Sequence, residues 1–235
     1  QVQPNGYFQA HESRMYSHAF ATLFLAEAYG MSENEALRPA LQKAVDLIVD
    51  SQNRDGGWRY TPYTEDADMS VSACQVMALR AARNDGIDVP KATIDKAIAY
   101  VKKAQNADGG FRYLLSPGPS RFPRSAAGVA TLFYAGIYEG PEIERGLQYL
   151  TEQLPTREKS WHGQFYHYGH YYAVQAMFLA GGEYWEKWWP GIRREILGKQ
   201  VGDGSWSSDR GYEYGTAMSL IILQMPNRLL PIFQR

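Results

Sequence analysis

The chain repeats a short turn sequence at intervals of about 50 residues, and this repeat limits the folds open to it. The segment Gln52-Asn-Arg-Asp-Gly-Gly-Trp58 recurs as Gln105-Asn-Ala-Asp-Gly-Gly-Phe111 and as Gln200-Val-Gly-Asp-Gly-Ser-Trp206. A weaker copy begins at Gln3 and runs to Tyr7, and a degenerate copy begins at Gln153. The five glutamines are separated by 49, 53, 48 and 47 residues, a supersecondary repeat length. We therefore expect about five similar structural units.

Each unit reads as a pair of helices. The first helices are apolar nearly all round, which predicts burial on both faces: Tyr16–Tyr29, Ser70–Arg83, Ser125–Tyr138, Gly169–Ala180 and Gly215–Met225. We expect glycine or proline turns to end them, at Gly30, Gly86, Gly140, Gly181 and Pro226. The second helices are amphipathic: Ala36–Ser51, Ala92–Ala104, Pro141–Gln153 and Trp185–Lys199.

These helices predict an all-α ring in two layers, with the first helices inside and the second helices outside. Strand signals are weak and limited to residues 110–115. Five inner helices have only four outer partners, so one inner helix is left uncovered. We expect a single domain over residues 1–235, truncated at its N-terminus, with an upstream segment or a partner domain completing the ring.

Composition restricts the partners and the chemistry. The chain has 235 residues, 45% of them hydrophobic, enough to bury one sizeable core. Its net charge is -1 and no long charged run occurs, so neither nucleic acid nor an anionic membrane is an indicated partner. Cys74 is the only cysteine, which excludes an intrachain disulfide. We see no apolar stretch long enough for a membrane span, and the sequence indicates no compartment.

Two aspartates stand where the second of the inner helices should begin. Asp66 and Asp68 follow the Gly-Gly-Trp58 turn and precede the apolar pattern from Ser70 onward. Carboxylates there can cap free backbone N–H groups and are favoured by the positive end of the helix dipole. The alternative is that an acid lies at the mouth of a cavity. The residues alone leave both interpretations open.

The repeat resembles the QW motif of the squalene and oxidosqualene cyclase family. Lys43-Ala-x-x-Leu-Ile-x-x-x-Gln52-x-x-x-Gly56-x-Trp58 carries the resemblance, as do Lys96 to Phe111 and Gln200 to Trp206. The resemblance implies an α/α toroid, a fold shared with protein prenyltransferase β subunits. In such a turn the glutamine amide can bond to groups at neighbouring helix ends while the tryptophan packs on the turn. We interpret these residues as structural.

A second resemblance concerns the two aspartates. Protonation-initiated cyclases carry an Asp-x-Asp-Asp-Thr-Ala motif in this place, and Asp66-Ala-Asp68-Met-Ser-Val matches it in part. The resemblance implies that Asp68 is the general acid that protonates an alkene or epoxide and that Asp66 is its neighbour. The chain departs from the motif at Met69, which replaces the third aspartate, and at Ser70-Val71. Those cyclases also use a second helical domain, and only one is visible here.

A cyclase also needs ring faces that stabilise a cation in a dry site. Aromatic residues of the inner helices are candidates for this lining, with a plain core as the alternative: Tyr16, Phe20, Phe133, Tyr134, Tyr171, Tyr172 and Phe178. His18 and His170 fall near the starts of inner helices, where either could hydrogen-bond Asp68. His167 and His170 share a helical face, but no third ligand is near them in sequence, and we expect no metal and no cofactor.

Two functions fit these residues. The first is a terpenoid-cyclase-like enzyme, formally an isomerase or lyase, in which Asp68 protonates a polyprenyl or triterpene-type substrate. The second is a non-catalytic toroid that binds a lipid, a peptide or a protein. A hydrophobic small molecule, an isoprenoid or lipid, is the ligand of the first function and one of the possible ligands of the second. The sequence does not decide whether the chain is an enzyme.

Overall fold

The computed structural model describes residues 3–9, 14–32, 34–155 and 163–233, and in these residues the fold is all-α. The inner helices are α1 (Arg14–Ser32), α3 (Met69–Asn84), α5 (Phe122–Tyr134), α7 (Tyr166–Ala180) and α9 (Tyr212–Gln224). The outer helices are α2 (Arg38–Asp50), α4 (Lys91–Ala104), α6 (Pro141–Thr151) and α8 (Gly182–Gly198). Three 3₁₀ turns complete the description: η1 (Glu35–Leu37), η2 (Met225–Asn227) and η3 (Pro231–Phe233).

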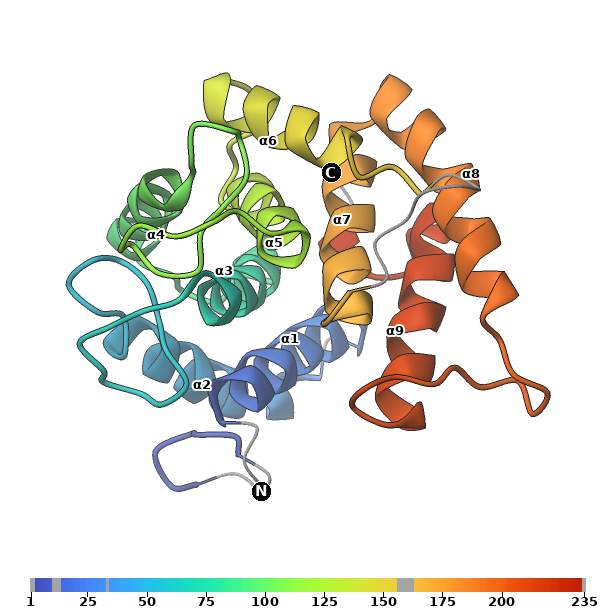
Figure 1. Ribbon diagram of the computed structural model, residues 1–235. Helices are drawn as coiled ribbons and strands as arrows, with labels where there is room; N and C mark the ends of the chain where they lie inside the picture. The colour runs from blue at the N-terminus through green and yellow to red at the C-terminus, as the bar shows by residue number, and fades with distance from the viewer. Residues whose placement is uncertain (1–2, 10–13, 33, 156–162, 234–235) are drawn as a thin grey trace.

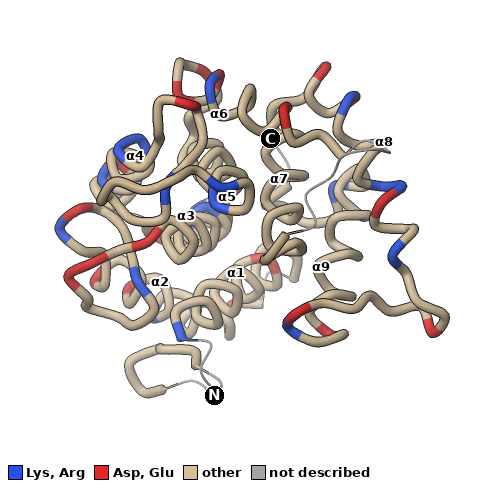
Figure 2. The backbone as a smooth tube through the Cα atoms, viewed as in Figure 1, with Lys and Arg blue, Asp and Glu red and all other residues tan. Residues whose placement is uncertain are grey.

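The helices form the predicted two layers of an α/α toroid (Figure 1). Each inner helix packs against the next one along the chain, and the outer helices lie against them from outside. In α3 and α5 nearly every side chain is buried, whereas α6 buries only one face. Figure 2 shows the same division by charge, since the charged residues gather on outer helices and loops and α7 contains none.

The glutamine–aromatic turns fasten each outer helix to the next. The amide Nε2 of Gln52 donates to the carbonyl of Gly56 in its own turn, at 2.9 Å, and to the carbonyl of Thr93 in α4, at 2.8 Å. Gln105 makes the equivalent pair of bonds to Gly109 and to Glu142 in α6. The Trp58 indole N–H donates to the carbonyl of Ile48 at the end of α2. These bonds confirm the structural interpretation of the turns.

Turn glycines let the next outer helix approach very closely. Gly56 and Gly109 have φ angles of +94° and +83°. A Cβ atom at Gly56 would lie 2.2 Å from the backbone oxygen of Lys96, and one at Gly109 would lie 2.3 Å from that of Arg145. Glycine is therefore required twice over, by its backbone angle and by the missing side chain.

The structure corrects two details of the repeat. Gln3 forms the backbone bonds to Tyr7 and Gly6 that Asn53 forms to Gly57 and Gly56. The first copy is thus shifted by one residue, and Phe8, not Tyr7, corresponds to Trp58. Two predicted helix ends also differ: α1 continues past Gly30 to Ser32, whereas α5 ends at Tyr134 and Gly140 is the N-cap residue of α6. Gly30 instead gives room to the carboxylate of Asp85.

In the described residues α9 has no extensive contact with α1, and Figure 1 shows these two helices at the open side of the array. The C-terminal turn η3 packs instead on α1 and α3. There the carboxylate of Glu27 accepts the backbone N–H of Ile232, and both residues are buried. Among the described residues, no helix is both long enough and apolar enough to cross a membrane.

Candidate functional site

Asp68 is held at the first residue before α3 by its backbone and by its side chain. Its N–H donates to the carbonyl of Trp58 at 2.9 Å, which ties the helix start to the turn. Its Oδ1 accepts the backbone N–H groups of Ser70 and Val71, each at 2.9 Å. The residue has no solvent exposure. Asp68 is therefore a helix cap, and it is also a fully buried carboxyl group.

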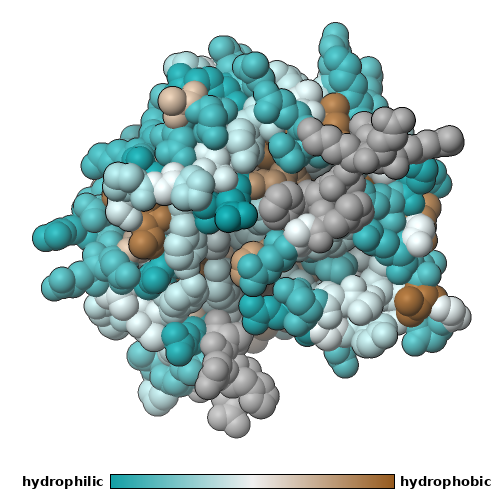
Figure 3. Space-filling view, viewed as in Figure 1, coloured by the Kyte–Doolittle hydropathy of each residue, from teal (hydrophilic) through white to brown (hydrophobic). Residues whose placement is uncertain are grey.

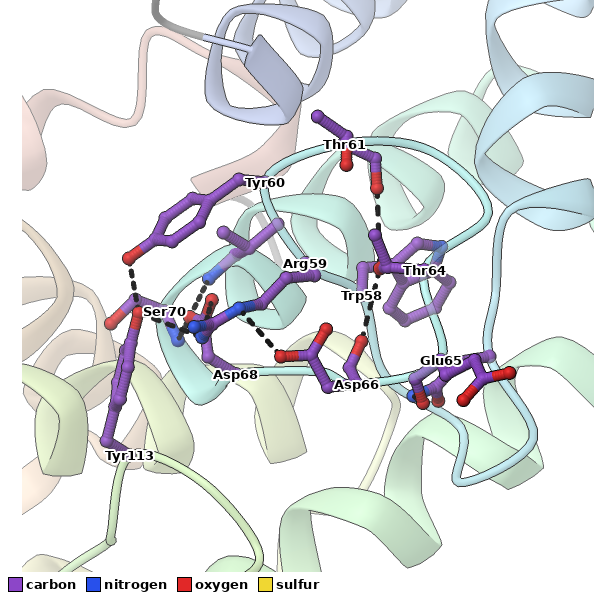
Figure 4. A network of polar contacts seen from close by, with 12 residues as sticks. Trp58, Arg59, Tyr60, Thr61, Thr64, Glu65, Asp66, Asp68, Ser70 and Tyr113 are labelled. Atoms are coloured by element: carbon purple, nitrogen blue, oxygen red, sulfur yellow. Dashed lines mark hydrogen bonds and ion pairs between the residues drawn. The ribbon is translucent and has the colours of Figure 1, made fainter.

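Arg59 occupies the other side of this carboxyl group (Figure 4). Its Nη1 lies 3.1 Å from Asp68 Oδ2 and its Nε lies 3.2 Å from Asp66 Oδ2. The side chain of Asp66 is 64% exposed, so the two aspartates have very different surroundings. Asp66 does not cap α3 and reaches Asp68 only through the shared guanidinium.

Two tyrosines from successive repeats enclose the guanidinium of Arg59. The guanidinium carbon lies 4.7 Å from the ring centre of Tyr60 and 5.4 Å from that of Tyr113. Arg59 Nη1 donates to the Tyr113 hydroxyl at 3.2 Å, and the two tyrosine hydroxyls are hydrogen-bonded to each other. Figure 4 shows the two rings meeting end to end at their hydroxyl groups, beside the Arg59–Asp68 pair.

The surroundings of Asp68 shift its pKa in opposite directions. Burial raises the pKa of Asp68 above its ordinary value, because a charged carboxylate is poorly solvated there. The Val71 N–H, the Arg59 charge, the Ser70 N–H and the Tyr113 hydroxyl all act to lower the same pKa. The net change in this pKa is upward. The group is held toward its protonated form, yet its conjugate base has several donors ready to stabilise it.

A cluster of aromatic side chains from α1 and α7 lies against the same end of α3. The Phe20 and Tyr171 rings are 6.1 Å apart, and Tyr172 lies 4.9 Å from Tyr171. The Tyr172 hydroxyl is 3.2 Å from Cys74 Sγ. Tyr168 belongs to the cluster through its ring contact with Tyr172 and its bond to the Ser70 carbonyl. The structure thus brings together three of the predicted lining residues.

The other predicted aromatics differ in how close they come to this cluster. Tyr16 lies on the Asp68 side, with its ring 6.2 Å from that of Tyr60. The Tyr134 hydroxyl bonds to the side chain of Gln175 in α7. The Phe133 ring, in contrast, contacts Tyr138 beyond the end of α5. This contact points away from the cluster, and a role for Phe133 in binding stays a prediction.

The two histidines do not join Asp68. His18 Nδ1 accepts the backbone N–H of Phe8, and its Nε2 bonds to the carbonyl of Ala44 in α2, so both ring nitrogens are engaged. The aromatic residues Trp58 and Phe111 donate their backbone N–H groups in the same way to Ser72 and Ser125. His18 therefore joins the turn at Phe8 to α2. The predicted bond to Asp68 is wrong.

His170 lies on the outer side of α7. Its ring packs 5.1 Å from that of Phe122, 4.5 Å from that of Tyr166 and 6.3 Å from that of Trp188. Within the described residues the polar partners of the Asp68 carboxyl group are Arg59, Ser70, Val71 and Tyr113, without a histidine. The expected bond from His170 to Asp68 is therefore also wrong.

Four residues of this site were not predicted from the sequence: Arg59, Tyr60, Tyr113 and Tyr168. The repeat itself carries the signal for three of them. Arg59 directly follows Trp58, while Tyr60 and Tyr113 each come two residues after the aromatic residue of their turn. Tyr168 stands four residues before Tyr172 and so shares its helical face.

The described residues offer little other chemistry. Cys74 is buried, and burial raises the pKa of its thiol to about 12, so it is a poor nucleophile. No group of three His, Cys, Asp or Glu side chains in the described ranges could hold a metal ion. A surface pocket of about 480 Å³ between the end of α6 and the start of α8 shares no residue with the Asp68 site.

Comparison with solved structures places this architecture among known folds. A type II terpene cyclase, MstE from Scytonema, matches with a TM-score of 0.71 and 15% identity, over 99% of this chain and 70% of that one. That structure holds geranylgeranyl dihydroxybenzoate as substrate. A protein from Actinoplanes matches with a TM-score of 0.71 and 15% identity, over 94% of this chain and 70% of that one. At such identities the likeness concerns the fold.

Sequence comparison points in the same direction. Drimenyl diphosphate synthase from Streptomyces showdoensis is 32% identical over 114 residues, which are 47% of this chain and 20% of that protein. The chain thus spans about a fifth of this curated relative. The family model described as the prenyltransferase alpha-alpha toroid domain matches residues 1–163. This match covers more than half of the sequence, and the chain belongs to the prenyltransferase alpha-alpha toroid domain family.

Proposed function

We propose that the chain is the acid-bearing toroid of a terpene cyclase that starts its reaction by protonation. The observation that carries the proposal is a carboxyl group with no solvent exposure, Asp68, beside an aromatic cluster that α1 and α7 place against α3. Burial raises the pKa of Asp68, which favours the protonated form that such a reaction needs. The likeness to type II terpene cyclases supports this proposal at the level of the fold.

In the proposed first step Asp68 gives its proton to the terminal double bond of a polyprenyl chain. The carboxyl O–H bond breaks as a C–H bond forms, and the other alkene carbon becomes a tertiary cation. The carboxylate left behind is stabilised by the N–H groups of Ser70 and Val71 and by the Arg59 guanidinium. These donors are what makes a buried carboxyl group acidic enough to protonate carbon.

The cation then passes along the substrate as successive double bonds attack it. Each attack forms a C–C bond and moves the positive charge, until loss of a proton ends the sequence. The net change is an isomerisation, because one proton enters and one leaves. We propose that the ring faces of Phe20, Tyr168, Tyr171 and Tyr172 stabilise the intermediate cations and that the substrate is a hydrophobic isoprenoid.

The test compares the chain with its Asp68→Asn variant. Asparagine is also a good N-cap, so Oδ1 can keep its two backbone bonds while the acidic proton is lost. Squalene, linear prenyl diphosphates and geranylgeranyl dihydroxybenzoate are incubated with each protein, and products are identified by gas chromatography or liquid chromatography with mass spectrometry. We expect cyclised product from the native protein and at least a roughly 100-fold lower rate from the variant.

Deuterated water makes the experiment specific for protonation. Product formed in D₂O is expected to carry one deuterium at the carbon that Asp68 protonates, since the acid exchanges with solvent between turnovers. Asp66→Asn is the matched control, because this exposed carboxylate touches the site only through Arg59. Equal activity of native protein and Asp68→Asn, or product without deuterium, would contradict the proposal.

One observation favours the second candidate function, a non-catalytic toroid that binds a lipid, a peptide or a protein. The ion pair with Arg59 and the two backbone bonds satisfy Asp68 as a carboxylate, which is the form that a purely structural cap needs. Absence of product from both folded proteins, together with a lower melting temperature for Asp68→Ala than for Asp68→Asn, would favour this function.

A further inference from the structure

The last turn of the array, residues 200–206, is fully formed on the side of the preceding outer helix. The Trp206 indole N–H donates to the carbonyl of Ile196 at 2.7 Å, as that of Trp58 does to Ile48. The Trp206 backbone N–H donates to Thr216 Oγ1, as that of Trp58 does to Ser72 Oγ. The turn therefore has the same construction as the others up to this point.

On its other side this turn lacks the partner that the earlier turns have. Gln52 and Gln105 each bond to a carbonyl in the following outer helix, whereas Gln200 Nε2 bonds to Gly204 alone among the described residues. A Cβ at Gly204 would meet within 4 Å only Gln200 Nε2, at 3.8 Å. Gly204 nevertheless keeps the positive φ, +85°, of Gly56 and Gly109.

Leu220 on α9 also lacks a covering outer helix among the described residues. Thr216 takes the place of Ser72 and Ser125, so Leu220, four residues further on, corresponds to Val76 and Val129. Both valines have no exposure, whereas Leu220 is 45% exposed. The turn between α8 and α9 also exposes Val201, by 40%, and Figure 3 shows hydrophobic surface at the right-hand edge, on the side where Figure 1 has this turn.

The complete repeats show which kind of residue covers the position equivalent to Leu220. A Cβ at Gly146 of α6 would lie 2.5 Å from Val129 Cγ2, so the helix presents a residue without bulk there. Ala97 takes the place of Gly146 in α4, one residue after Lys96 as Gly146 follows Arg145. The carbonyl that accepts the glutamine amide comes four residues earlier in each helix, at Thr93 and Glu142.

We propose that residues 200–206 and Leu220 form a docking seat for one further amphipathic helix of the outer-layer kind. The helix has Ala or Gly against Leu220, a free backbone carbonyl four residues earlier for Gln200, and its backbone against Gly204. The seat does not depend on the proposed catalytic function, because it rests on the geometry of the repeats alone.

The occupant does not come from a second copy of the described chain. The corresponding faces of α2, α4 and α6 are already buried against Gly6, Gly56 and Gly109, and Gly191 of α8 is buried against Pro155. The occupant is therefore a helix from polypeptide other than the described residues. Ser205 further restricts which side chains the docking helix can have. Glycine at the corresponding positions, Gly57 and Gly110, makes room for Tyr100 and Tyr149 of the covering helix.

Ser205 has a side chain in that space, so the docking helix has a residue smaller than tyrosine three positions after its small residue. Among the outer helices α2 has this pattern, with Ala44 followed by Leu47. A peptide with the sequence of residues 34–51, stapled across its solvent face to keep it helical, is therefore the probe. Its binding to the folded 235-residue chain is measured by calorimetry and located by amide chemical shifts.

We expect saturable binding with one peptide per chain and shift changes at Gln200, Gly204 and Leu220. The same peptide with Ala44→Leu is expected to bind at least roughly ten-fold more weakly, because the added bulk meets Leu220. Leu220→Glu in the protein is expected to weaken binding to a similar degree. Phe24→Glu, at another exposed apolar side chain, is the matched control and should leave binding unchanged.

Three results would contradict the proposal of a docking seat. These are no binding to a chain shown by circular dichroism to be folded, equal binding of the native and Ala44→Leu peptides, or shift changes outside the last turn and α9. Since no catalytic residue takes part, the outcome is independent of the Asp68 experiment.

Discussion

At the scale of single residues, the acidity of Asp68 depends on a neighbour only nine positions before it. Arg59 lowers the pKa of Asp68, which burial raises, and its guanidinium is shared with the exposed Asp66. The same arginine therefore affects both the protonated fraction of Asp68 and the strength of Asp68 as an acid. Tyr113 adds a hydroxyl from the next repeat to the same group.

Replacing Arg59 tests this dependence in the proposed enzyme. In Arg59→Gln the lost positive charge is expected to raise the pKa of Asp68 further. Because the protonated form is the active one, the loss of activity at high pH should move to higher pH, and the maximal rate should fall since the acid is weaker. The measurement is the pH profile of kcat/KM. A profile unchanged in position, or shifted downward, would show that Arg59 does not act on Asp68.

His18 shows a residue whose chemistry is used for the fold. Burial lowers its pKa to about 4, opposed by its bond to the Ala44 carbonyl, so the imidazole is neutral over the ordinary pH range. The neutral ring can accept the Phe8 N–H at Nδ1 while it donates from Nε2, whereas a protonated ring has no acceptor at Nδ1. The folded state loses this arrangement when acid protonates the ring.

At the scale of elements, the contact between a turn glycine and the next outer helix holds neighbouring repeats together. Gly109 and Gly136 make a matched pair for measuring it. Both have positive φ, +83° and +89°, but a Cβ at Gly109 would strike the Arg145 carbonyl, whereas one at Gly136 has nothing within 4 Å. The difference between them is the close approach alone.

We expect Gly136→Ala to cost roughly 1–2 kcal/mol through backbone strain. Gly109→Ala should cost about 1–3 kcal/mol more, because the helix α6 must move away. Gly204→Ala in this chain should resemble Gly136→Ala, since no helix covers it among the described residues. Denaturant unfolding gives the three free energies. Equal costs at Gly109 and Gly136 would show that the close approach contributes nothing.

At the scale of the whole molecule, one buried carboxyl group joins the two ends of the described chain. Glu27 in α1 accepts the N–H of Ile232 in the C-terminal turn. Burial and, to a smaller extent, the nearby charge of Asp85 raise the pKa of Glu27 from 4.5 to about 7, against the effect of the Ile232 bond. The folded protein therefore binds a proton at pH values where the unfolded chain has lost it.

The sign of the resulting pH dependence follows from linkage. Stability from Glu27 is complete below pH 4.5 and is lost as the pH rises through about 7. Glu27→Gln keeps an oxygen for Ile232 and removes the charge. The variant should gain stability relative to the native protein between about pH 5 and 8, by at most about 3 kcal/mol. Thermal unfolding of both proteins over this range measures it, and a constant difference would contradict the raised pKa.

The repeat predicted the architecture because it is a local property of the chain. The spacing of the glutamines fixed the unit length, and the apolar pattern of each helix decided its layer. Fully apolar helices such as α5 cannot face water, and half-apolar helices such as α6 cannot be buried on both sides. The position of Asp68 at a helix start was predictable for the same reason.

The candidate site was predicted only in part, because its contacts join separate repeats. The sequence placed Asp68 at the start of one inner helix and Tyr171 and Tyr172 on another, but the pairing of Arg59 with Asp68 follows from the path of the loop after Trp58. The one-residue shift of the first repeat and the outward contacts of His18 were decided in the same way, by how neighbouring turns pack.

By itself, then, the sequence determined the helices, their two layers and the residues that fasten them, since each of these depends on periodicity along a single segment. Tertiary structure alone decided which side chains meet: that Arg59 and Tyr113 surround Asp68, that the histidines turn away, and that Leu220 is left uncovered. The physical reason is that burial and hydrogen bonding at these positions depend on atoms contributed by another repeat.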